Sequence, residues 1–377
     1  MELLYLTVPS YFDLEISLIR DLSRYCKVKV LVVVSPESQK SSAFVLDKLK
    51  DKVGIYPWSS YEGLKKYANM INQEQWFIAN NPDNSLISGF LLSRKINRWI
   101  KKADLVHCTT DCKTILFCLP VVLFKKHTLY TVHDPIPHNR VSIFRKCYIN
   151  MGYWCFKNLL FLSQSYKDLI EKEFKRYHIF YSKLGVYDFL NFYETERFVN
   201  EDYILFFGRI DKYKGVDILI RAYLKSTLPN RNIKLVIAGK GNIDSNNSKD
   251  PNIIVFNRYI DNGELASLIK YSSFVVLPYR TVTQSGVLKS AYAFDKPVIA
   301  TRIGDFAMEI NDGVEGLLVN PSDEEDLCKG LDKMINSNLE DFSKRIHDKY
   351  STAGEEGWQQ IAKHLYLETY NSICLNS

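Results

Sequence analysis

Three cationic side chains lie between residues 206 and 217, after an apolar run and before an amphipathic one, and two of them can reach one point. Arg209 and Lys214 flank a polar turn that begins at Gly208. A guanidinium group can hold two phosphate oxygens at once, and a lysine ammonium acts as a compact point charge. The turn therefore predicts a site for a phosphorylated ligand. The alternative is a solvated turn that happens to carry two surface cations.

A second loop, residues 277–288, offers a different phosphate ligand. Its polar residues Gln284 and Ser285 come directly before Gly286 and Val287, where a helix is expected to begin. Unpaired N–H groups and the helix dipole favour an anion at such a point, and glycine lets the anion approach the backbone. In the alternative, Ser285 is only an N-cap. Together the two loops predict a pyrophosphate site with cations on one side and a helix N-terminus on the other.

The first half of the chain has one polar loop with comparable chemistry. His133 and Asp134 follow an apolar run, and Pro135 and Pro137 hold the next residues extended. A neighbouring carboxylate can orient an imidazole and raise its pKa. The alternative is a solvated loop without a chemical role.

Apolar runs alternate with amphipathic stretches in both halves, which predicts two doubly wound α/β domains with parallel sheets. Ligands of such sheets bind beyond the carboxyl ends of the strands, where the loops above lie. We expect domains at 1–190 and 196–355, and a C-terminal helix within 356–377 that packs back on the first domain. The expected strands are Leu3–Val8, Lys27–Val34, Leu105–Cys108, Thr128–Val132, Leu159–Leu162, Tyr203–Phe207, Lys234–Ala238, Ile253–Phe256, Phe274–Leu277 and Pro297–Ala300.

Length and composition agree with two folded domains. The chain has 377 residues, of which 46% are hydrophobic and 24% charged. The longest apolar run, Thr114–Phe124, is too short for a membrane span, and the first residues lack the pattern of a signal peptide. The eight cysteines form no Cys-x-x-Cys pair, so we expect reduced thiols, no metal site and a cytoplasmic protein.

The motifs of the second half occur in a familiar order. Together they resemble the nucleotide-sugar domain of the GT-B glycosyltransferases, and most closely family 4, whose members retain the anomeric configuration. The resemblance covers residues 203–334. It is carried by four stretches: Gly208–Asp217, Val236–Gly241, Lys296–Thr301 and Glu315–Val319.

The resemblance implies a role for each candidate residue of the second half. Arg209 and Lys214 would hold the donor diphosphate and neutralise it as it leaves, without a metal or other cofactor. The backbone near Tyr259 and Ile260 would receive the base. The remaining donor-binding positions would be Gly208, Gln284, Ser285, Gly286, Val287 and Ser290.

For the first half, the resemblance implies that His133 and Asp134 lie beneath the donor sugar as catalytic groups. His138 would face the acceptor, and so would Tyr11, whose ring either stacks on a sugar or packs in the core with Phe12.

The chain departs from the family at two positions. Val282 and Ser290 stand where two glutamates are usual, and the Gln-Ser-Gly turn is typical of one branch of these enzymes. The expected function is transfer of a sugar from a nucleoside-diphosphate donor to a glycan or lipid-linked glycan, in synthesis of a surface polysaccharide such as a capsule. Two alternatives remain: a sugar-nucleotide 2-epimerase of the same fold, and a non-catalytic partner subunit.

The charge of the chain is uneven, and this suggests a further partner. Residues 1–195 hold 27 Lys and Arg against 18 Asp and Glu. We expect no nucleic-acid partner, because no aromatic-basic recognition motif is present. We expect peripheral binding to the anionic inner face of a membrane, through the basic and aromatic stretch 140–183, which includes Tyr153, Trp154 and Phe156.

Overall fold

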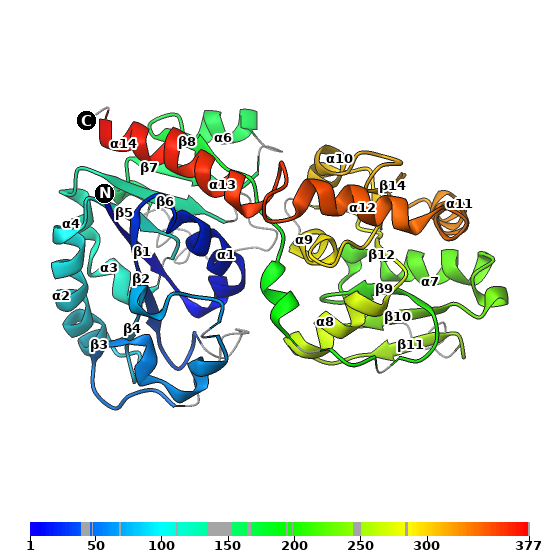
Figure 1. Ribbon diagram of the computed structural model, residues 1–377, viewed down its shortest axis with the longest axis horizontal. Helices are drawn as coiled ribbons and strands as arrows, with labels where there is room; N and C mark the ends of the chain where they lie inside the picture. The colour runs from blue at the N-terminus through cyan, green and yellow to red at the C-terminus, as the bar shows by residue number, and fades with distance from the viewer. Residues whose placement is uncertain are drawn as a thin grey trace. The chain divides into compact units, whose positions relative to one another are not determined.

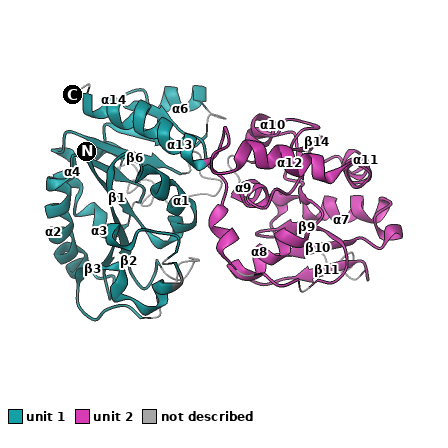
Figure 2. Ribbon diagram, in the orientation of Figure 1, with its two compact units in different colours: residues 1–184, 358–377 teal, residues 185–357 magenta. Residues whose placement is uncertain are grey.

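The computed structural model describes residues 1–38, 46, 48–67, 69–110, 112–133, 153–163, 167–193, 195–197, 199–243, 250–282 and 286–375. Backbone contacts divide the chain into two compact units, shown in Figure 2. Unit 1 comprises residues 1–184 and 358–377, and unit 2 comprises residues 185–357. The first boundary lies a few residues before residue 190, where the sequence placed the end of the first domain.

Unit 1 is built on an eight-stranded sheet of order β3-β4-β2-β1-β5-β6-β7-β8, in which only β3 is antiparallel to its neighbour. The strands are β1 (Glu2–Thr7), β2 (Lys27–Val34), β3 (Gly54–Pro57), β4 (Trp76–Asn80), β5 (Leu105–Cys108), β6 (Thr128–Val132), β7 (Asn158–Phe161) and β8 (His178–Tyr181). The helices are α1 (Phe12–Leu22), α2 (Leu86–Lys102), α3 (Lys113–Leu116), α4 (Leu119–Leu123), α6 (Lys167–Glu173), α13 (Trp358–His364), a π-helical turn (Leu365–Tyr370) and α14 (Asn371–Leu375).

The C-terminal helices belong to unit 1, where α13 packs against α1 (Figure 1). A buried polar chain anchors them to the sheet. The ring of His107 in β5 contacts the Tyr370 hydroxyl through Nδ1 at 2.7 Å and the Thr131 hydroxyl through Nε2 at 2.6 Å. Because all three side chains are buried, these hydrogen bonds fix the position of the C-terminal segment on the sheet.

Unit 2 is built on a six-stranded, fully parallel sheet of order β11-β10-β9-β12-β13-β14. The strands are β9 (Tyr203–Phe207), β10 (Lys234–Ala238), β11 (Ile253–Phe256), β12 (Val275–Leu277), β13 (Val298–Thr301) and β14 (Gly316–Val319). The helices are α7 (Val216–Lys225), α8 (Asn262–Tyr271), α9 (Gly286–Tyr292), α10 (Gly304–Glu309), α11 (Glu324–Ile335) and α12 (Leu339–Tyr350). Since β10 and β12 flank β9, the loops after these three strands meet at one edge of the sheet.

The expectation for the stretch 140–183 is wrong in part. Phe156 is 1% exposed and Tyr153 packs against the same core, whereas Trp154 is 60% exposed. Residues 140–152 lie outside the described residues. Among the helices that the structure describes, none is both long and apolar enough to cross a membrane.

Candidate functional site

The loop after β9 begins with a close approach of two backbones. The N–H of Gly208 donates to the carbonyl of Ala238 at 2.9 Å, and Gly208 has a φ of +113°. A Cβ at Gly239 would lie 1.9 Å from the Gly208 carbonyl oxygen. Only glycine tolerates such an approach, so these residues fix the exit of β9 against the end of β10.

The same loop is also held against the loop after β12. Gly215 has a φ of +70°, and a Cβ there would lie 1.9 Å from the carbonyl oxygen of Pro278. The N–H of Arg280 donates to the Tyr213 carbonyl at 2.7 Å. The Arg280 side chain donates to the Lys212 carbonyl and to both Asp217 carboxylate oxygens, at 3.0 and 2.8 Å. These contacts join the two loops that the sequence singles out.

We predict that Gly215→Ala lowers the free energy of unfolding by about 3–5 kcal/mol, because the new methyl group must displace the Pro278 carbonyl. Gly313→Ala is the matched control. Gly313 has a φ of +80° but nothing within 4 Å of an added Cβ, so only the strain of about 1–2 kcal/mol applies. Denaturant unfolding measures both variants, and equal losses would contradict the packing of Gly215 on Pro278.

Lys214 is buried where the loop after β9 contacts the loop after β12. Its side chain is buried, and Nζ lies 3.7 Å from the ring centroid of Tyr279 and 5.3 Å from that of Tyr213. Burial and, to a smaller extent, the nearby charge of Arg209 lower the pKa of Lys214 to about 7, and Asp211 opposes the shift. An anion bound at Lys214 would stabilise the charged ammonium and so raise this pKa again.

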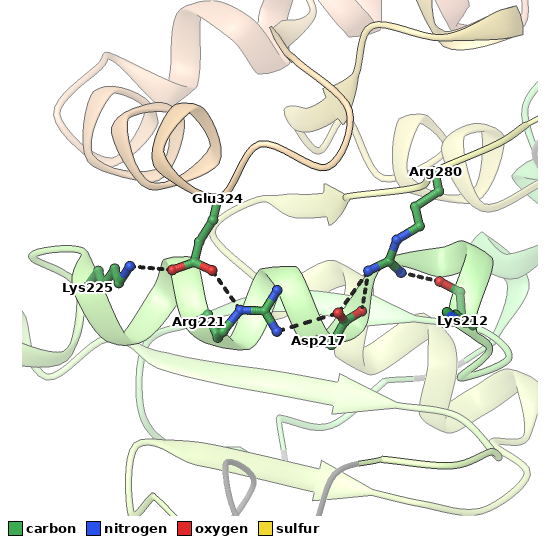
Figure 3. A network of polar contacts seen from close by, with 6 residues as sticks. All are labelled: Lys212, Asp217, Arg221, Lys225, Arg280 and Glu324. Atoms are coloured by element: carbon green, nitrogen blue, oxygen red, sulfur yellow. Dashed lines mark hydrogen bonds and ion pairs between the residues drawn. The ribbon is translucent and has the colours of Figure 1, made fainter.

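Three cations on and near α7 form ion pairs, whereas Arg209 and Lys214 form none with the residues that the structure describes. Figure 3 shows a chain of ion pairs that runs from Arg280 through Asp217 and Arg221 to Glu324, which also holds Lys225. Within the described residues, neither Arg209 nor Lys214 forms an ion pair with a carboxylate. Arg209 is exposed. The two cations that the sequence selects are therefore available to balance the charge of a ligand.

The start of α9 lies beside this loop. A Cβ at Gly208 would be 3.6 Å from Cγ2 of Val287, and a Cβ at Gly286 would be 2.7 Å from the Tyr187 hydroxyl oxygen. The Ser290 hydroxyl is buried and donates to the Gly286 carbonyl at 2.9 Å. Gln284 and Ser285 lie outside the described residues. The structure thus brings Gly208 and Val287 together at the carboxyl end of β9.

The candidate base-binding residues follow β11. Tyr259 is 67% exposed and Ile260 is half-buried. The Asn257 side chain makes two 3.0 Å hydrogen bonds with the backbone of Gly241, so the loops after β10 and β11 are joined. Both loops lie at the same edge of the sheet as Gly208.

In unit 1, the structure brings His133 and Tyr11 together. Their rings stack at a centroid distance of 3.8 Å and an angle of 10°. Burial lowers the pKa of His133 to about 4, so the expectation of a raised pKa is wrong and the imidazole is neutral at pH 7. Asp134 and His138 lie outside the described residues. Phe12 is a core residue, stacked on Trp58.

Two further polar residues, Glu15 and His107, line a cavity of about 20 Å³ with His133. This volume suffices for one water molecule. Burial raises the pKa of Glu15 to about 8 and lowers that of His107 to about 3, so both are neutral at pH 7. Neither residue was predicted from the sequence, although a carboxylate on the apolar side of α1 and a histidine within β5 were available signals.

In the described part of the chain, no three His, Cys, Asp or Glu side chains come together in a way that could hold a metal ion.

Comparison with solved structures identifies the fold. The crystal structure of HepE from Anabaena in complex with UDP superposes with a TM-score of 0.66 at 14% identity, covering 99% of this chain and 100% of that one. The two parallel-sheet units therefore have the GT-B glycosyltransferase fold.

Sequence comparison adds a narrower match. Residues 201–337 match the family model described as "Glycosyl transferases group 1". A D-inositol 3-phosphate glycosyltransferase of Corynebacterium aurimucosum is 29% identical over 156 residues, 38% of this chain and 36% of that protein. An uncharacterized 41.2 kDa protein in the cps region of Klebsiella pneumoniae is 27% identical over 129 residues, 34% of this chain and 36% of that protein. The chain thus matches less than half the length of these curated relatives.

Proposed function

We propose that this protein is a retaining glycosyltransferase of family 4, in the branch with a Gln-Ser-Gly turn. It transfers a sugar from a nucleoside-diphosphate donor to a hydroxyl of a glycan or lipid-linked glycan. The observation that carries this proposal is that Arg209 and Lys214 form no ion pair with a carboxylate among the described residues. Both lie within the segment that matches the family model. The UDP complex of HepE supports a nucleoside-diphosphate donor, and the cps-region relative supports a role in surface polysaccharide synthesis.

The difficult step is departure of the diphosphate while positive charge develops on the anomeric carbon. Fixed cations that meet this charge stabilise the transition state without reorganisation. Arg209 and Lys214 supply two such charges, and we propose no further cofactor. Val282 offers no carboxylate nucleophile, so the leaving phosphate accepts the acceptor proton, as the resemblance to family 4 implies. The neutral ring of His133 orients a sugar hydroxyl by hydrogen bonding.

A ligand screen followed by a turnover assay tests this function. We expect one nucleoside diphosphate and its sugars to raise the melting temperature of the protein, and acceptor-dependent release of the diphosphate from the sugar nucleotide. Epimerisation of the donor without an acceptor would indicate the 2-epimerase instead. Binding without any turnover would indicate a non-catalytic subunit, and the absence of binding to every nucleoside diphosphate would overturn the proposal.

A further inference from the structure

The outward side of α2 is apolar in its first half. Leu86 and Ile87 are 67% and 74% exposed, and Phe90 and Leu91 are 51% and 46% exposed. Large apolar side chains gathered at this level of exposure are uncommon on a protein surface without a binding role. The inward side of α2 packs on the following segment, since a Cβ at Gly89 would lie 3.4 Å from the Phe117 ring.

The second half of the same side is cationic. Helical spacing places the cations in line with the exposed apolar residues, and α2 contains no Asp or Glu. These exposed cations are Arg94, Lys95, Arg98, Lys101 and Lys102.

The end of α4 extends this surface. Helix α4 lies beside α2 (Figure 1), and the residue after it, Phe124, is 88% exposed. The Lys125 ammonium donates to the Ala103 carbonyl, which places the end of α4 at the end of α2. Between residues 86 and 127 there are eight Lys and Arg against two Asp and Glu. The α2–α4 face is defined here as Leu86, Ile87, Phe90, Leu91, Arg94, Arg98, Lys101, Lys102, Phe124 and Lys126.

We propose that the α2–α4 face binds the surface of an anionic membrane. Exposed aliphatic and aromatic side chains can enter the boundary between headgroups and acyl chains, while the cations pair with anionic headgroups. A second copy of the chain is a poor occupant, because two such faces would bring like charges together. The four exposed apolar side chains of α2 would contribute nothing to nucleic-acid binding through phosphate contacts. The inference is independent of the proposed activity, because lipid binding is its readout.

Co-sedimentation with vesicles tests the proposal on the full chain. We expect preferential binding to phosphatidylcholine vesicles that contain phosphatidylglycerol over phosphatidylcholine alone, and weaker binding at high salt. Each cation near an anionic surface contributes about fivefold to partitioning, so R98E/K101E/K102E should reduce binding by at least about a hundredfold. The apolar variant I87S/F90S should also reduce binding while the salt dependence remains.

The matched charge control is K270E/K333E/K344E, which makes the same charge change at exposed positions of unit 2. L224S/L367S is the apolar control at exposed positions outside the face. Both controls should bind like the wild type. Equal losses in both charge variants would overturn the proposal, because net charge alone would then explain binding. Binding of the wild type that does not depend on anionic lipid would also overturn the proposal. A dimer of the wild type that I87S/F90S abolishes would point to a second copy of the chain instead. Stronger competition by single-stranded RNA than by anionic vesicles would point to nucleic acid.

Discussion

Lys214→Met is expected to lower kcat/KM for donor turnover by about 10²–10³-fold, the usual cost of removing one preorganised charge from a transition state. The reason is geometric: Lys214 is buried against Tyr279 and has no carboxylate partner among the described residues. Arg209→Ala is expected to lower kcat/KM by about 10²-fold, because Arg209 is exposed to water, which weakens its interaction with the diphosphate relative to that of the buried Lys214.

The control for Lys214→Met is Lys212→Met in the same turn. The side chain of Lys212 is exposed, and Arg280 uses only its backbone carbonyl, so turnover should remain close to wild type. Thermal unfolding separates catalysis from folding, because a methionine replacing a buried cation should not destabilise unit 2. Wild-type kcat/KM in both Lys214→Met and Arg209→Ala would contradict the proposed function.

The second large effect is a pH dependence of nucleotide binding. The pKa of Lys214 is about 7 in the unliganded protein, against an ordinary value of 10.5. A bound diphosphate raises this pKa, so the complex holds more protons than the unliganded protein at alkaline pH. Affinity for UDP should therefore be nearly constant below about pH 7 and fall by up to tenfold per pH unit above it.

Titration calorimetry shows directly whether the protein takes up or releases protons when UDP binds. We expect proton uptake on UDP binding at about pH 8, seen as a dependence of the binding enthalpy on the buffer, because Lys214 gains a proton in the complex. Lys214→Arg keeps its charge throughout this range and should bind with little pH dependence. Proton release by the wild type, or an equal pH dependence in Lys214→Arg, would show that another group controls binding.

Composition alone did not locate the surface that we propose for membrane binding. The excess of basic residues in the first 195 positions suggested an anionic partner as a hypothesis, and the stretch 140–183 was chosen because aromatic residues accompany its cations. Phe156 proved to be core, whereas the exposed side of α2 has the stronger combination of apolar and cationic residues. Exposure depends on which side of a helix packs inward, and only the tertiary structure determines that.

The sequence by itself determined the alternation of strands and helices, and with it two parallel sheets, because buried strands must be continuously apolar. It also selected Gly208, Arg209 and Lys214, since phosphate chemistry requires glycine and cations after a strand. The order of the strands and the antiparallel β3 came from the tertiary structure. So did the contact of Gly215 with Pro278, which joins loops more than sixty residues apart.

The electrostatic state of the site was likewise decided by tertiary packing. The sequence shows His133 next to Asp134 and suggests a raised pKa, but burial lowers the pKa of His133. The same holds for Glu15, whose pKa rises to about 8, and for Lys214, whose pKa falls to about 7, because the fold removes both side chains from water. A sequence specifies which groups can ionise, whereas the cost of charging them depends on the solvent that the folded chain excludes.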